Sequence, residues 1–200
     1  ACGGKFTVAC SPTFGKVNLA PPRPFTDYIG ITEWGMRDAN WSPDFKTSSV
    51  QVLALYDRER AIARPDLPAV DGIIAITPEV AADLLRMTGP IKIDDVTFTA
   101  DNLLDTLQYQ VHQAFLTKGI PDAQRKQILG KLVKEVFAHL MKLPADRWPE
   151  ILKSAQRHLT EKRILLYERD PVLQEIFERN RWAGRMVATD GDYLRWVDAN

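Results

Sequence analysis

The sequence predicts an α/β fold: a mixed central sheet with flanking helices and a helical insertion. Residues 70–76 form an apolar run with the composition of a strand buried on both faces, and an amphipathic helix and a second apolar run follow at once. Residues 101–161 then hold three successive stretches of helical periodicity before strand-like sequence resumes. We therefore expect one α/β domain over residues 1–200, in which residues 101–161 are a helical insertion.

The first elements are predicted to be a hairpin, a connector and a helix. Residues 5–9 and 15–19 are β-compatible, and a turn at Ser11-Pro12 separates them. Extended chain is expected next, because each proline removes a backbone donor and restrains the preceding residue; these prolines are Pro21, Pro22 and Pro24. Ser42-Pro43 is typical of a helix N-cap and first helical residue, and the helix is expected to continue over residues 45–60.

The remaining elements alternate between helices and strands. Thr77-Pro78 is expected to begin a helix over residues 78–87, and Gly89-Pro90 is expected to end it. Further helices are predicted over residues 101–118, 121–141, 147–161 and 170–178, and further strands over residues 91–93, 96–98, 163–167 and 193–197. Because a strand, a helix and a strand follow one another closely after residue 70, a parallel or mixed sheet is favoured.

Composition excludes several classes of protein. The chain has 26 Lys and Arg against 26 Asp and Glu, so no overall field attracts nucleic acid, and no apolar run is long enough to cross a bilayer. Cys2 and Cys10 are expected to be free or packing thiols, since no other cysteine could build a metal site or a disulfide framework. The histidines His112, His139 and His158 fall in predicted helices and are expected at the surface or half-buried rather than as catalytic bases.

Residues 36–45 hold the side chains best suited to phosphate and metal chemistry. Arg37 can bind an oxyanion through two donors, and Asp38 and Asp44 offer the hard oxygens that Mg²⁺ prefers. The predicted helix start would add free backbone N–H groups. The alternative is structural: Asp44 complements a helix dipole and Arg37 pairs with Asp38. Likewise Arg58, Arg60 and Arg64 either add phosphate contacts or form a solvated helix end.

Several landmarks resemble the bacterial family called domain of unknown function 4012. The main landmarks are residues 37–45 (RDANWSPDF), residues 70–77 (VDGIIAIT), Leu84-Leu85 and residues 88–91 (TGPI). The likeness extends over nearly the whole chain through Gly3-Gly4, residues 163–167 and residues 197–200. Ala1-Cys2 stands where that family has Pro-Thr. The resemblance implies a fragment truncated at both ends, taken from a protein that is extracytoplasmic and membrane-anchored through segments outside this chain.

The order of these landmarks also resembles, more distantly, the LytR-CpsA-Psr phosphotransferases, which move glycopolymers from a polyprenyl-pyrophosphate carrier onto the cell wall. This resemblance implies a Mg²⁺-dependent phosphotransferase, since phosphoryl transfer needs positioning and charge neutralisation more than a histidine base. The roles it suggests are Arg37 and Asp38 as catalytic residues, Asp38 and Asp44 as metal ligands, and Asn40, Trp41, Arg58 and Arg60 as substrate contacts.

A second hypothesis makes the chain a noncatalytic envelope module. It would bind a glycan or a protein partner through Trp34 and Trp41 if these indoles are exposed, although packing onto the core is an equal alternative. A serine or cysteine hydrolase is disfavoured, because the sequence has no Gly-x-Ser-x-Gly motif and its cysteines have no evident nearby base.

Overall fold

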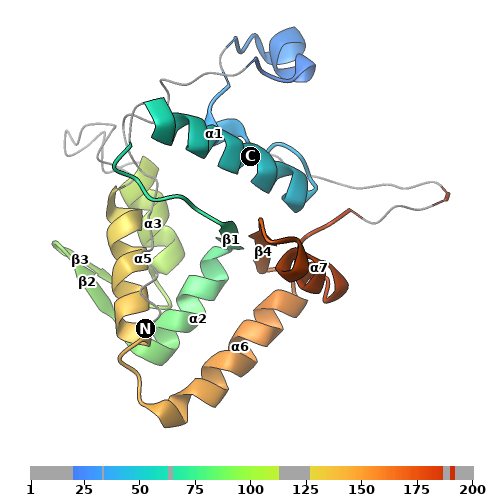
Figure 1. Ribbon diagram of the computed structural model, residues 1–200. Helices are drawn as coiled ribbons and strands as arrows, with labels where there is room; N and C mark the ends of the chain where they lie inside the picture. The colour runs from blue at the N-terminus through green and yellow to red at the C-terminus, as the bar shows by residue number, and fades with distance from the viewer. Residues whose placement is uncertain (1–19, 33, 63–64, 113–126, 187–189, 192–200) are drawn as a thin grey trace. The chain divides into compact units, whose positions relative to one another are not determined.

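The computed structural model describes residues 20–32, 34–62, 65–112, 127–186 and 190–191, which form an α/β structure (Figure 1). Cys2, Cys10 and Arg64 lie outside the described residues, as do the strands predicted over residues 5–9, 15–19 and 193–197. The chain divides into two compact units. We call Ala75–Ile164, together with Ala1–Pro12, the helical unit; Thr13–Ile74 and Leu165–Asn200 make up the split unit.

The helical unit consists of four described helices and one hairpin. Its helices are α2 (Pro78–Thr88), α3 (Leu103–His112), α5 (Gln127–Leu140) and α6 (Trp148–Thr160), and a 3-10 turn, η3 (Ala145–Arg147), precedes α6. The hairpin pairs β2 (Ile91–Ile93) with β3 (Val96–Phe98) in antiparallel register, with Ile91 opposite Phe98. These bounds confirm the predicted helix at residues 78–87 and both short strands.

The core of the helical unit lies between the hairpin and the helices. Helix α2 contacts α3, α5 and α6, and α5 also contacts β2. The fully buried Phe98 and Leu103 join α3 to the hairpin, and Leu85 of α2 and Val136 of α5 complete the same cluster. Alternate residues of β2 point inwards, as expected for a strand with one solvated face. Apolar residues of α2, α3 and α5 therefore form this core together with the hairpin.

The split unit is assembled from two distant parts of the sequence. Its first part contains the short helical turns η1 (Phe25–Ile29) and η2 (Met36–Asp38), the helix α1 (Phe45–Ile62) and most of β1 (Gly72–Ile76). Its second part contains most of β4 (Ile164–Glu168) and the helix α7 (Pro171–Arg179), which the Asp170 side chain caps by accepting hydrogen bonds from Val172 N and Leu173 N. Strand β1 pairs with β4.

The pairing of β1 differs from the parallel or mixed sheet favoured by the sequence. Thr77 N donates to Arg163 O at 3.0 Å and Arg169 N donates to Asp71 O at 2.8 Å, so the two strands run antiparallel. The prediction that this strand is buried on both faces was also wrong, because Ile74 is 61% exposed. The described residues supply β1 with one partner strand, β4, and with no layer over the face that carries Ile74.

The extended connector predicted at the prolines was wrong in its second half. The chain turns helical at Arg23, Phe25 N donates to Pro22 O at 2.9 Å, and η1 follows directly. Pro24 has φ −57° and ψ −31°, which suits the first turn of a helix, where a missing N–H costs nothing.

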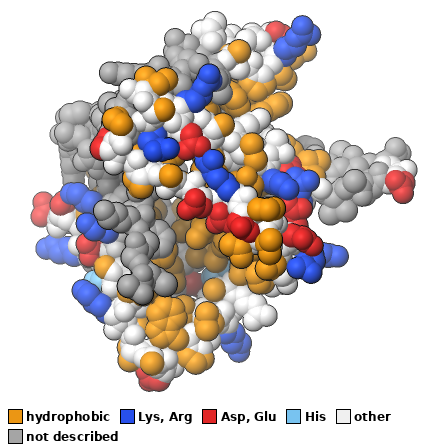
Figure 2. Space-filling model, viewed as in Figure 1, with side chains coloured by type: hydrophobic (Ala, Val, Ile, Leu, Met, Phe, Trp, Pro, Cys, Tyr) orange, Lys and Arg blue, Asp and Glu red, His pale blue; other side chains and the backbone are white. Residues whose placement is uncertain are grey.

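Acidic and basic side chains are interspersed on the face shown in Figure 2, in keeping with their equal totals.

Candidate functional site

The chain before α1 is fixed to that helix by a buried tryptophan. Trp34 is 5% exposed, and its Nε1–H donates to Asp38 O at 3.0 Å across η2. Trp34 and the fully buried Ala39 pack against Leu55 of α1. Trp34 therefore belongs to the core, and it does not offer a binding surface to a glycan or a protein.

Asp44 caps α1 and ties it to a distant segment. Its Oδ1 accepts hydrogen bonds from Thr47 N and from Arg185 Nη1, both at 2.9 Å, and its Oδ2 accepts one from Met186 N at 2.9 Å. The helix begins at Phe45, so Asp44 is its N-cap and the sequence-based choice of Ser42 was wrong. A carboxylate can accept several hydrogen bonds at once, and here both oxygens are already bound within the protein.

The electrostatics of Asp44 agree with this structural role. Burial alone would raise the pKa of its carboxyl group, but hydrogen bonds from Met186 and Thr47 and the charge of Arg185 outweigh it and lower the pKa. The carboxyl group of Glu178 on α7 behaves similarly, because its hydrogen bond with Lys46 Nζ at 2.8 Å lowers its pKa. These acids form a network that joins the start of α1 to α7 and residues 185–186.

The other residues singled out for phosphate chemistry lie at different depths. Asn40 and Arg58 are exposed, and Asp38 is half-buried at the end of η2. Arg37 is in η2, but its side chain lies outside what the structure describes. Within the described residues, no group of three or more His, Cys, Asp or Glu side chains could hold a metal ion. The Mg²⁺ site stays a prediction, and both oxygens of Asp44 already accept hydrogen bonds within the split unit.

Arg60 has an unused hydrogen-bond donor. It is half-buried on α1, and its Nε atom is buried with no hydrogen-bond partner among the described residues. Ser49 Oγ, Gln51 Oε1 and Glu59 Oε1 on the same helix are buried without partners in the same part of the chain. Buried polar atoms are usually satisfied, so α1 has hydrogen-bonding capacity left over among the described residues.

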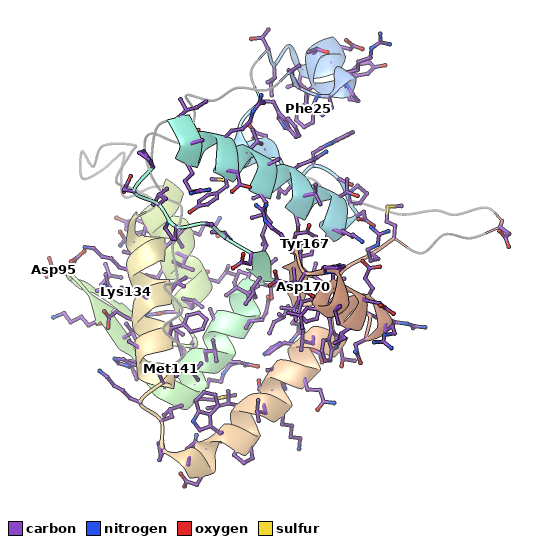
Figure 3. The ribbon with its side chains drawn as sticks, viewed as in Figure 1. Phe25, Asp95, Lys134, Met141, Tyr167 and Asp170 are labelled. Carbon is purple, nitrogen blue, oxygen red and sulfur yellow. The ribbon has the colours of Figure 1, made fainter. Side chains whose placement is uncertain are left out.

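An exposed group of apolar side chains gathers around η1 and the turn that follows η2. Trp41 is 44% exposed, and its ring meets that of Phe25 edge to face, with centroids 5.6 Å apart and an interplanar angle of 78°. Phe25 lies on η1, which has no buried residue, and Tyr28 of the same turn is 87% exposed (Figure 3). We call Phe25, Tyr28, Ile29 and Trp41 the aromatic surface.

A charged cluster in the helical unit escaped the sequence reasoning. The Asp83 carboxylate on α2 forms ion pairs with Arg86 of the same helix and with Arg157 of α6, and it lies 2.9 Å from His158 Nε2. His158 is only 2% exposed, so the expectation of a surface or half-buried histidine was wrong. The ring contacts Asp83, which lies 75 residues earlier in the sequence, and local helical periodicity does not indicate such a contact.

Comparison with known proteins places the chain in a family. A family model described as "protein of unknown function (DUF4012)" matches residues 9–112, just over half of the 200 residues. The chain belongs to the DUF4012 family. Within this DUF4012 chain the match includes the aromatic surface, α1 and the β2–β3 hairpin, whereas α6 and β4 lie beyond it. No curated protein and no solved structure matches the chain significantly.

The described helices of this DUF4012 chain include none with the length and apolar character needed to span a membrane. That finding concerns only these residues.

Proposed function

We propose that this DUF4012 chain is a noncatalytic cell-envelope module that binds a glycan through the aromatic surface. The observation that carries the proposal is the state of Trp41: its indole is 44% exposed, yet Phe25 braces it edge to face. A braced ring loses little conformational freedom on binding, which lowers the entropic cost of association. The envelope location rests on the resemblance to envelope phosphotransferases described above.

Aromatic side chains suit the faces of sugar rings for a physical reason. A pyranose presents a patch of C–H groups on one side and hydroxyl groups at its edge, and an indole offers a flat apolar face with one N–H donor. On the aromatic surface, the edge-to-face contact leaves one face of Trp41 or Phe25 turned away from its neighbour. Tyr28 adds a phenol that can exchange hydrogen bonds with hydroxyl groups.

The test is binding of the full chain to purified cell-wall polysaccharide, measured by co-sedimentation and calorimetry. Trp41→Ala and Phe25→Ala should each weaken binding at least about tenfold, the effect of losing a central aromatic contact. Tyr109→Ala is the matched control, because Tyr109 is similarly exposed but lies on α3 of the helical unit. Equal binding by wild type and both variants would refute the proposal. Binding of a protein by the wild-type chain but not by Trp41→Ala would favour the protein-partner alternative.

A second candidate, the Mg²⁺-dependent phosphotransferase, is favoured by one observation: the buried Nε donor of Arg60 has no partner among the described residues. In this candidate Arg37 and Arg60 would hold the oxygens of a polyprenyl pyrophosphate, and Asp38 would bind Mg²⁺. Geranyl pyrophosphate, titrated with and without Mg²⁺, is the probe. Arg60→Gln should weaken its binding while Arg179→Gln on α7 should not, and unchanged binding by Arg60→Gln would count against this candidate.

A further inference from the structure

Two arginines of the helical unit are held side by side at the surface by one acid. Arg86 binds Oδ1 of Asp83 and Arg157 binds Oδ2. Since these oxygens belong to a single carboxylate, the two guanidinium groups must lie close together. Both remain open to solvent: the Arg86 side chain is 57% exposed and that of Arg157 is 54% exposed. Each guanidinium has five N–H donors, so both keep donors beyond those that face Asp83.

The buried histidine beneath them keeps the acid in place. His158 Nε2 is 2.9 Å from Asp83 Oδ2, and its Nδ1 is buried without a partner in the described residues. At this distance the Nε2–H group can donate a hydrogen bond to the Asp83 carboxylate. One carboxylate thus holds two guanidinium groups at the same time.

We propose that Arg86 and Arg157 form a clamp that binds the phosphate group of a ligand. Guanidinium groups bind phosphate through paired, charge-assisted hydrogen bonds, and two groups fixed in advance can share one phosphate without ordering two free side chains. Asp83 and His158 are positioning residues in this proposal. Glu79, one turn before Asp83 on α2, is an exposed acid. The clamp is independent of the aromatic surface, which belongs to the split unit.

The experiment has one arm for each source of phosphate. Inorganic pyrophosphate is titrated into the full chain and followed by calorimetry, and vesicles containing phosphatidic acid in phosphatidylcholine are tested by flotation. Arg86→Gln and Arg157→Gln should each weaken binding about fivefold to tenfold, and the double variant should abolish it. Arg147→Gln is the matched control, because Arg147 is an exposed arginine that pairs with a carboxylate, Glu150, at the start of α6.

Each outcome decides the proposal. Binding of soluble pyrophosphate that the double variant loses supports a clamp for a free phosphate ligand, and binding only to vesicles with the same loss supports a lipid headgroup. Absence of binding in both arms overturns the clamp, as does binding that the double variant retains or that Arg147→Gln loses equally. Because both arginines are largely exposed, the variants should fold, and circular dichroism checks this. Arg60→Gln affects only the phosphotransferase candidate, so the two proposals can fail separately.

Discussion

Asp44 accepts a hydrogen bond from Arg185 across 141 residues of sequence, with 2.9 Å between Oδ1 and Nη1. The same carboxylate accepts a hydrogen bond from Met186 N, and it caps α1 by accepting another from Thr47 N. An acid that the sequence offers as a metal ligand thereby closes the split unit by joining its two parts. Mg²⁺ at this carboxylate would compete with the hydrogen bonds that join the two parts.

The first prediction concerns this junction. Asp44→Ala should lower the free energy of unfolding by about 2 kcal/mol, since it removes the helix cap and leaves Met186 N and Arg185 without their acceptor. Asp44→Asn should cost less, because an amide oxygen can still cap the helix. Urea denaturation measures both values, and Asp101→Asn, at an exposed acid of the helical unit, is the control. A stability loss no greater than that of the control would show that the junction adds nothing.

The second prediction is a loss of stability in acid. Burial alone would raise the pKa of Asp44 above its ordinary value of 3.8, but hydrogen bonds from Met186 and Thr47 outweigh burial and lower it in the folded chain. The hydrogen bond from Lys46 lowers the pKa of Glu178 from its ordinary value of 4.5. A lowered folded pKa gives stability that is present above the ordinary value and lost as pH falls through the folded one. The urea midpoint should therefore drop between about pH 5 and about pH 2. Asp44→Asn should flatten that drop, and an unchanged slope would contradict the assignment.

The third prediction compares two glycines of the split unit. A Cβ at Gly72 would lie 2.4 Å from Tyr167 O, where β1 passes β4, so Gly72→Ala should cost about 1–3 kcal/mol. A Cβ at Gly35 meets nothing within 4 Å, and its φ of −112° suits any residue. Gly35→Ala should be neutral or slightly stabilising. Thermal unfolding of the two variants checks this, and equal melting temperatures would argue against the close approach of the strands.

The fourth prediction separates the two tryptophans. Trp34→Phe should cost about 1 kcal/mol, because it removes the Nε1–H bond to Asp38 O within the core, and Trp34→Ala about 3–5 kcal/mol. Trp41→Ala should change stability by less than about 1 kcal/mol, since that side chain is exposed, while reducing glycan binding. Denaturation and binding are measured on the same samples. A large stability loss in Trp41→Ala would mean that its binding defect is a folding defect.

Local chemistry made several elements predictable from the sequence. Thr77-Pro78 marks the start of α2 and Asp170-Pro171 that of α7, because proline at the first helical position and a capping residue before it act within one turn. The β2–β3 hairpin was predictable for the same reason: the turn at Asp94 joins strands that are adjacent in sequence, and Asp94 adopts the left-handed conformation that Asp tolerates.

Long-range relationships could not be read in this way. The antiparallel partner of β1 is β4, about ninety residues later in the chain, and neither strand carries a mark of the other. The same limit applies to the site. Nothing near Asp44 in sequence indicates Arg185, so an acid predicted to be a metal ligand is a helix cap in the structure. Nothing near His158 indicates Asp83, so a histidine predicted at the surface or half-buried is buried.

The discontinuity of the split unit sets the order in which it can fold during synthesis. Strand β1 and helix α1 leave the ribosome long before Leu166, whose N–H donates to Trp182 O, and before Gly184, whose carbonyl oxygen accepts Phe45 N at 3.1 Å. Residues 75–164 of the helical unit lie between these two parts in the sequence and are made before the second part. Until residue 186 is made, the start of α1 has no Arg185 and no Met186 for Asp44 to bind. Until its second part is made, the nascent split unit lacks both the partner strand of β1 and the partners of Asp44.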